Sequence, residues 1–84
     1  MQLEILTPER KIFSGEVYGL YLPGTEGTFE ILERHAPIVA SLRKGKMKVF
    51  KDKNTTQSYE ISGGFVEMIN NKASVLLEDA KALD

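Results

Sequence analysis

The sequence predicts an all-β domain, a single β-sandwich of about ten short strands that spans residues 1–84. Apolar and polar residues alternate with period two in short segments along the chain. Glycine, proline and asparagine separate these segments at short intervals, and no segment of useful length has the 3.6-residue period of a helix. Together these patterns are typical of a β-sandwich or a small closed barrel.

The first quarter of the chain predicts three extended segments. Gln2–Leu6 alternates polar and apolar side chains. Residues 11–13 form a short extended piece that Ser14-Gly15 closes. Residues 16–22 are rich in valine, leucine and tyrosine, which suit a pleated surface. A turn is then expected at Pro23-Gly24, because proline fixes φ and glycine allows positive φ.

The middle of the chain continues the pattern with three more strands. Residues 28–32 follow the glycine at 27. Pro37 opens the strand Ile38–Leu42, since proline is tolerated at the first residue of a strand. Gly45 marks the turn into residues 46–51.

The last third predicts a meander of three strands. Residues 56–62 place Tyr59 and Ile61 on one face, and residues 65–69 and 72–78 follow. Asn70-Asn71 suits a tight hairpin between the last two, because asparagine tolerates positive φ. Residues 79–84 could begin a helix but are too few to stand alone as one.

Composition limits the class of protein. The 84 residues include no cysteine, carry a net charge of −1 and are 42% hydrophobic and 27% charged, as in a soluble globular domain. No apolar run has the length of a membrane span, and no signal peptide begins the chain. The sequence therefore predicts a cytoplasmic protein, or one held at a membrane only through partners.

Positive charge is concentrated in one stretch. Six basic residues and one acid lie between Arg43 and Lys53, which gives this stretch a charge of +5. Lysines on a hairpin keep a sheet edge soluble and unpaired. The alternative is a binding patch for an anionic partner.

Catalytic chemistry is not predicted. His35 is the single histidine, and no nucleophile elbow, phosphate loop or zinc motif is present. Glu26, Glu30 and Glu33 form an acidic run, but at about 3.3 Å per residue along a strand Glu26 and Glu30 lie too far apart to couple. We expect no cofactor and no metal.

Two binding functions remain open from the residues. Residues 46–49 (Lys-Met-Lys-Val) faintly resemble the lysine turn of swinging-arm biotinyl and lipoyl carrier domains. The basic stretch, with Phe50 and Tyr59 nearby, also suggests a small β-barrel that binds nucleic acid.

Three motifs in a fixed order favour another function. The first is residues 7–17, TPERKIFSGEV. The second is residues 22–29, LPGTEGTF, followed by His35-Ala36-Pro37. The third is residues 62–67, SGGFVE, which continues through residues 75–77. In this order and spacing they resemble the N-terminal domain of the epsilon subunit of the F-type ATP synthase, across residues 2–79.

The resemblance implies a β-sandwich that rides with the gamma subunit at the foot of the central stalk, where gamma meets the ring of c subunits. It implies a non-catalytic rotor subunit of a proton- or sodium-translocating synthase, peripheral at the cytoplasmic face of the plasma membrane. Its partners would be gamma and the c-ring, with no nucleic acid, no cofactor and membrane contact only through the complex.

The resemblance also implies two sets of contact residues. The loop facing the c-ring would contain Glu26, Gly27, Thr28 and Glu30, and the gamma side would contain His35, Ala36, Pro37 and Ala40. Relatives often carry an acid at the position of Thr28 and a glycine at that of Glu30. In this chain the acid comes two places later, so the charge of the loop is displaced.

The end of the chain differs from many relatives. Those continue into a C-terminal helical hairpin that inhibits ATP hydrolysis and in some binds ATP. This chain ends at Asp84. We expect a short form of the subunit, rather than a shortened piece, and no function that needs the hairpin.

Overall fold

The structure is a computed structural model that describes residues 1–83. The regular secondary structure of these residues is entirely β, which confirms the predicted class. The ten strands are β1 (Gln2–Leu6), β2 (Lys11–Glu16), β3 (Gly19–Gly24), β4 (Gly27–Leu32), β5 (Ile38–Leu42), β6 (Gly45–Phe50), β7 (Thr56–Ile61), β8 (Gly64–Ile69), β9 (Lys72–Leu77) and β10 (Ala80–Leu83).

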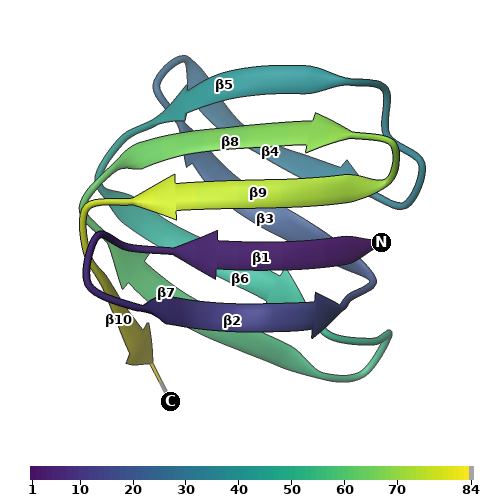
Figure 1. Ribbon diagram of the computed structural model, residues 1–84, viewed down its shortest axis with the longest axis horizontal. Helices are drawn as coiled ribbons and strands as arrows, with labels where there is room; N and C mark the ends of the chain where they lie inside the picture. Colours follow the sequence, from purple (N-terminus) through teal and green to yellow (C-terminus); the bar gives the residue numbers. More distant parts are fainter. Residues whose placement is uncertain (84) are drawn as a thin grey trace.

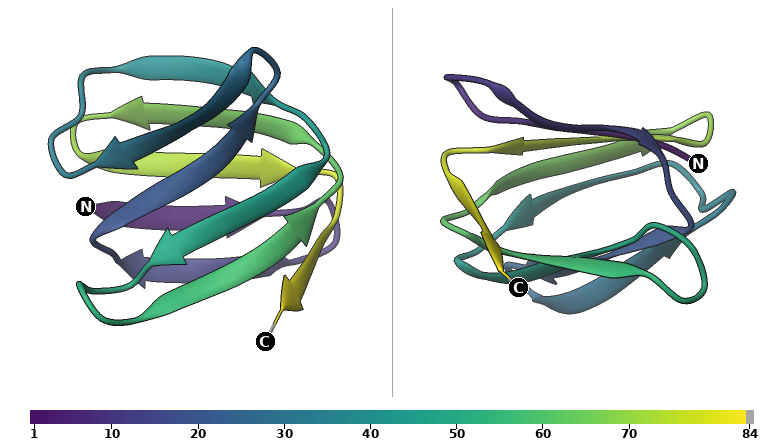
Figure 2. Two further views of the ribbon diagram at one scale, coloured as in Figure 1. Left: turned by 180° about the vertical axis from the view of Figure 1, so that it is seen from behind. Right: turned by 90° about the horizontal axis from the view of Figure 1, so that it is seen from below.

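The strands form two packed layers (Figures 1 and 2). One layer has the order β5-β8-β9-β1-β2, and the other contains β10-β7-β6-β3 with β4 paired to β3. Most neighbours are antiparallel, but β1 and β9 pair in parallel. The layers join at a corner where Gly24 of β3 pairs with Leu42 of β5. β4 pairs with β3 and not with β5, which leaves an open side to the sandwich between these two strands.

The core lies between the layers and follows the alternation along each strand. In β8, Val66 and Met68 are fully buried, whereas their neighbours Phe65 and Ile69 are exposed. Tyr59 and Ile61 are both buried, as their shared face predicts. Period two therefore assigns one side chain in two to the core, as expected for sheets packed on one face.

The boundary between β2 and β3 differs from the prediction. β2 runs through Ser14 and Gly15, which pair with Glu4 and Leu3, so these residues do not close the strand. The chain instead turns at Val17 and Tyr18, which are not part of either strand. Register with β1 thus outweighs the local turn preference of Ser-Gly.

The C-terminal residues, which could have begun a helix, form a strand within the described residues. Residues 80–83 form β10, which pairs with β7 from Ala80 opposite Ile61 to Leu83 opposite Ser58. The edge of β7 supplies backbone hydrogen-bond partners that a short isolated helix would lack. Asp84, the last residue of that segment, lies outside the described residues.

Candidate functional site

The predicted c-ring loop is the tip of the β3–β4 hairpin. The sequence prediction of a turn at Pro23-Gly24 is wrong, because these residues pair with Thr28 and Gly27 inside the hairpin. The turn is the next two residues, Thr25 and Glu26. Gly27 follows it with φ of 133°, a conformation that L side chains rarely adopt, so glycine is required there.

Hydrogen bonds tie this tip to the end of β5. The Thr25 N–H donates to the Ser41 carbonyl at 3.0 Å, and the two hydroxyls lie 2.8 Å apart. Arg43 follows β5; its N–H donates to the Pro23 carbonyl at 2.9 Å and its Nε to the Gly24 carbonyl at 3.2 Å. The tip is therefore held in place by the other layer rather than projecting freely.

A groove of about 330 Å³ lies between the hairpin tip and β5, on the open side of the sandwich. Its walls include Glu26 and Gly27 from the predicted c-ring set and Ala40 from the predicted gamma set, together with Phe29 and Ile38. The structure thus brings Glu26 and Gly27 of one predicted set and Ala40 of the other together in one groove.

The two acids of the predicted loop do not share a surface. Glu26 lines the groove, whereas Glu30 lies in mid-strand opposite Tyr21, on the outer face of the β3–β4 sheet. Thr28 lies on this same outer face, opposite Pro23. All three side chains are exposed, in agreement with a solvated loop.

His35, Ala36 and Pro37 lie on the loop that joins β4 to β5. They are separated from the hairpin tip by the length of β4, roughly 17 Å at about 3.3 Å per residue. The loop turns tightly, with the His35 N–H donating to the Leu32 carbonyl at 3.1 Å. Nδ1 of His35 lies 2.7 Å from the Ala36 carbonyl, which holds the imidazole against the loop.

Four exposed apolar side chains, here called the apolar strip, lie on the outer face of β5, β8 and β9: Val39, Phe65, Ile69 and Leu76. Glu67 interrupts them, because it lies between Phe65 and Ile69 on β8 and opposite Val39. Val39 is 71% exposed, Phe65 58%, Leu76 51% and Ile69 50%. Phe65 pairs with Leu76 across the strands. Pro37 continues the strip, because it lines a shallow cavity together with Val39 and Ile69. No sequence motif marks these side chains as a surface; the signal that could have found them is their outward register in the alternating pattern of each strand.

The carrier-domain motif does not occupy a hairpin tip. Lys48 lies within β6, paired with Tyr21 on one side and Ser58 on the other. Its ammonium rests 5.2 Å from the centre of the Tyr21 ring, a cation–π contact. A lysine in this position lacks the freedom that a swinging arm needs.

The suggested nucleic-acid platform is also dispersed. Tyr59 is only 7% exposed and belongs to the core, so it offers no stacking face. Lys46 lies opposite Glu60 on the neighbouring strand, and Lys51 lies 5.9 Å from the ring of Phe13 in the other layer. The basic stretch thus does not gather into one aromatic-lined groove.

Neither a cluster of metal-ligating side chains nor a membrane-spanning helix is present in the part of the chain that the structure describes. No group of three or more His, Cys, Asp or Glu side chains is arranged to hold a metal ion in residues 1–83. No helix in this part of the chain is long and apolar enough to cross a membrane.

Comparisons with known proteins identify the family. The model of the ATP synthase delta/epsilon chain β-sandwich domain matches residues 1–82. The ATP synthase epsilon chain of Chlorobium limicola is 42% identical over 78 residues, which cover 93% of this chain and 89% of the relative. That of Pelotomaculum thermopropionicum is 42% identical over 80 residues, which cover 95% of this chain but 59% of the relative.

Solved structures share the fold. A chain of the mitochondrial ATP synthase of Euglena gracilis superposes with a TM-score of 0.90 at 23% identity, and a chain of the Tetrahymena thermophila central stalk and c-ring with 0.83 at 16%. This chain spans 54% and 64% of their lengths. The sequence matches confirm the resemblance drawn from the three motifs: the chain belongs to the ATP synthase delta/epsilon family, as a β-sandwich domain of the epsilon-chain type.

Proposed function

We propose that this chain is a non-catalytic central-stalk subunit of an ion-translocating ATP synthase, where it couples the gamma subunit to the c-ring during ATP synthesis. The observation that carries the proposal is the family match over residues 1–82. In support, the structural neighbours come from assemblies described as F1/c-ring and central stalk/c-ring. Residues 1–84 would act as one domain.

The gamma subunit would dock on the apolar strip and the adjoining loop. Several exposed apolar side chains on one sheet face favour a protein partner over solvent. Pro37 and Val39 connect the strip with the predicted gamma set, His35, Ala36, Pro37 and Ala40. The rigid turn at His35 would present this edge without a further loss of conformational entropy on binding.

The c-ring would meet the hairpin tip. Glu26, Gly27 and Thr28 are exposed there, and the bonds to Ser41 and Arg43 fix the tip before any partner arrives. Glu26 can attract basic groups in polar loops of the ring, and Glu30 would contribute from the neighbouring sheet face. Contacts of this kind position a partner and add little affinity each.

Both surfaces are suited to binding partner subunits. The proposed role is therefore mechanical, and in this proposal the chain itself catalyses no reaction. The protein would sit peripherally at the cytoplasmic face of the membrane, held there by its partners. No observation favours the carrier or nucleic-acid functions over this one.

Co-purification tests the proposal. A tagged chain would be expressed in its own source organism and recovered from mildly solubilised membranes, and the bound proteins would be identified by mass spectrometry. We expect the gamma and c subunits in the bound fraction. Recovery of a biotin ligase, of RNA or of no synthase subunit would contradict the proposed function.

A further inference from the structure

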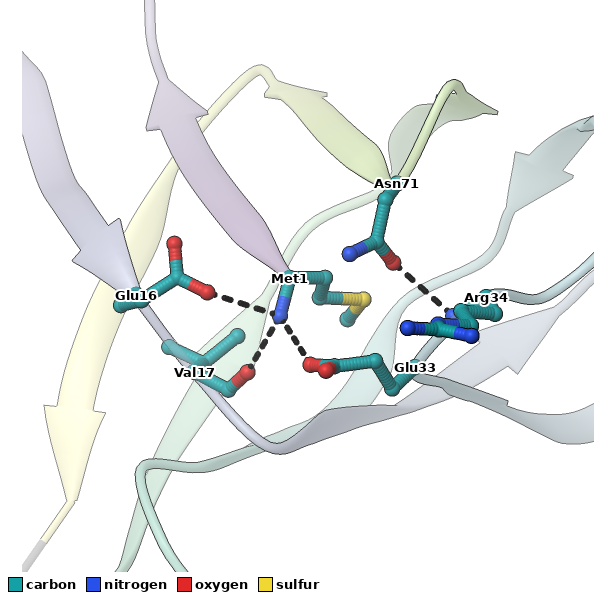
Figure 3. A network of polar contacts seen from close by, with 6 residues as sticks. All are labelled: Met1, Glu16, Val17, Glu33, Arg34 and Asn71. Carbon is teal, nitrogen blue, oxygen red and sulfur yellow. Dashed lines mark hydrogen bonds and ion pairs between the residues drawn. The ribbon is translucent and has the colours of Figure 1, made fainter.

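The amino group of Met1 lies where three segments of the chain meet (Figure 3). It donates to the Val17 carbonyl at 2.9 Å and to Oε1 of Glu33, and it forms an ion pair with Oε2 of Glu16 at 3.0 Å. An ammonium group carries three N–H donors, so each donor has one acceptor. The Met1 side chain is fully buried in the core, which fixes the position of the nitrogen.

This cluster holds the loop of residues 33–37. Glu33 is the first residue after β4, and its carboxylate reaches back to the amine. Arg34 follows with φ of 62°, a left-handed conformation that costs a non-glycine residue about 1 kcal/mol or more. Its N–H donates to Oδ1 of Asn71 at 2.8 Å, and the Asn71 carbonyl accepts from the Gln2 N–H at 3.1 Å. Both anchors of the loop therefore lead to the start of β1.

The Met1 amine and the Glu33 carboxylate each favour the charged form of the other. Burial alone lowers the pKa of the amine, but hydrogen bonds and charge from Glu33 and Glu16 outweigh burial and raise it above the ordinary 8.0. The hydrogen bond to the amine, with its charge and that of Arg34, holds the pKa of Glu33 below the ordinary 4.5. The shallow cavity beside the cluster also carries Lys51, Asp52 and Lys53 from the β6–β7 loop.

We propose that the α-ammonium of Met1 is a switch for the loop of residues 33–37, whose present shape is favoured when this nitrogen is a free, charged amine. A formyl group, an acetyl group or a preceding residue would convert the amine into an amide with one N–H and no charge. Glu16 and Glu33 would then lose their shared cation and repel each other. The site therefore responds to chemical modification at this nitrogen, and it does so without any partner subunit.

Nuclear magnetic resonance of the full chain tests the switch through the amide signals of Arg34 and His35. The free-amine chain would be compared with its Nα-acetylated form and with Glu33→Gln, which keeps the amine but removes the charge on the loop. Glu9→Gln, an exposed acid outside the cluster, is the matched control. We expect acetylation and Glu33→Gln to shift the loop signals in the same direction and Glu9→Gln to leave them in place.

A pH titration of the unmodified chain gives a second measurement that holds even if acetylation prevents folding. The amine is charged below its raised pKa, so the amide signal of Arg34 should show one step of change above about pH 8, as the amine is deprotonated. In Glu33→Gln the amine should lose its proton at lower pH, because the carboxylate that helps to raise its pKa is gone. Loop signals that do not follow the titration of the Met1 nitrogen, or that ignore acetylation in a folded chain, would overturn the proposal.

Discussion

Replacement of Phe65 and Leu76 by alanine removes the one cross-strand pair of the apolar strip and leaves the core intact. Phe65 is 58% exposed, and a phenylalanine side chain buries roughly 150–250 Å² when covered, so about 90–140 Å² remains for a partner. At about 25 cal/mol per Å² this area is worth about 2–3.5 kcal/mol at most, and half-exposed Leu76 adds about 1 kcal/mol. Because alanine retains part of the contact, we expect a loss of about 3 kcal/mol, or about 100-fold in affinity for gamma.

The same double variant should change folding little, because substitutions at exposed positions usually stay within about 0.5 kcal/mol. Tyr18 and Leu32 provide a matched control, since they are 45% and 44% exposed. Calorimetric titration with the gamma subunit would give the affinities, and thermal melting by circular dichroism the stabilities. An equal loss in both double variants, or full affinity in the strip variant, would refute the assignment of the strip to gamma.

Three other changes test separate parts of the account. Gly64→Ala should lower the melting temperature strongly, because the added Cβ would clash with the Leu76 carbonyl oxygen of β9. Gly15→Ala is the control and should be tolerated, because its Cβ would meet only the Phe13 ring at 3.5 Å. Equal melting temperatures of the two variants would contradict the close approach at Gly64. Glu26→Lys with Glu30→Lys should leave melting unchanged but impair proton pumping by the reconstituted synthase, because like charges would face the ring; a collapsed fold would make both residues structural. Hydrogen bonds from the Asn54 backbone N–H and from Thr55 lower the pKa of Asp52. The ionised carboxylate should therefore stabilise the β6–β7 loop above pH 3.8, and this stabilisation should be lost as pH falls through the lowered pKa. A melting temperature that depends on acid pH in the same way in Asp52→Asn would contradict this.

Much of the fold follows from local patterns. Alternation predicts which face of β7 and β8 is buried, because a strand places successive side chains on opposite sides. Asn70-Asn71 predicts the β8–β9 turn, and both residues have positive φ, 51° and 59°. These features need only the geometry of the chain over a few residues.

The remaining elements depend on pairing between distant residues. Gly15 looks like a turn residue, but opposite Leu3 it continues an edge strand. Residues 80–83 contain alanine, lysine and leucine, which favour a helix in isolation. The free edge of β7 outweighs that preference because it satisfies the backbone of β10.

The candidate surfaces were predictable in part. Motifs placed Glu26 and Gly27 at a loop, but their meeting with Ala40 depends on the corner at Gly24 and Leu42, a contact between layers. The contacts of the Met1 amine could not be predicted from a sequence motif, because the α-amine belongs to the backbone and not to a side chain.

Reconstitution tests the rotor role most directly. The chain would be added to an ATP synthase depleted of its epsilon subunit, in sealed vesicles, and ATP-driven ion pumping would be measured beside ATP hydrolysis. The account predicts that the chain rebinds and raises the number of ions pumped per ATP hydrolysed without inhibiting hydrolysis. A chain that rebinds and leaves coupling unchanged, or that strongly inhibits hydrolysis, would contradict it.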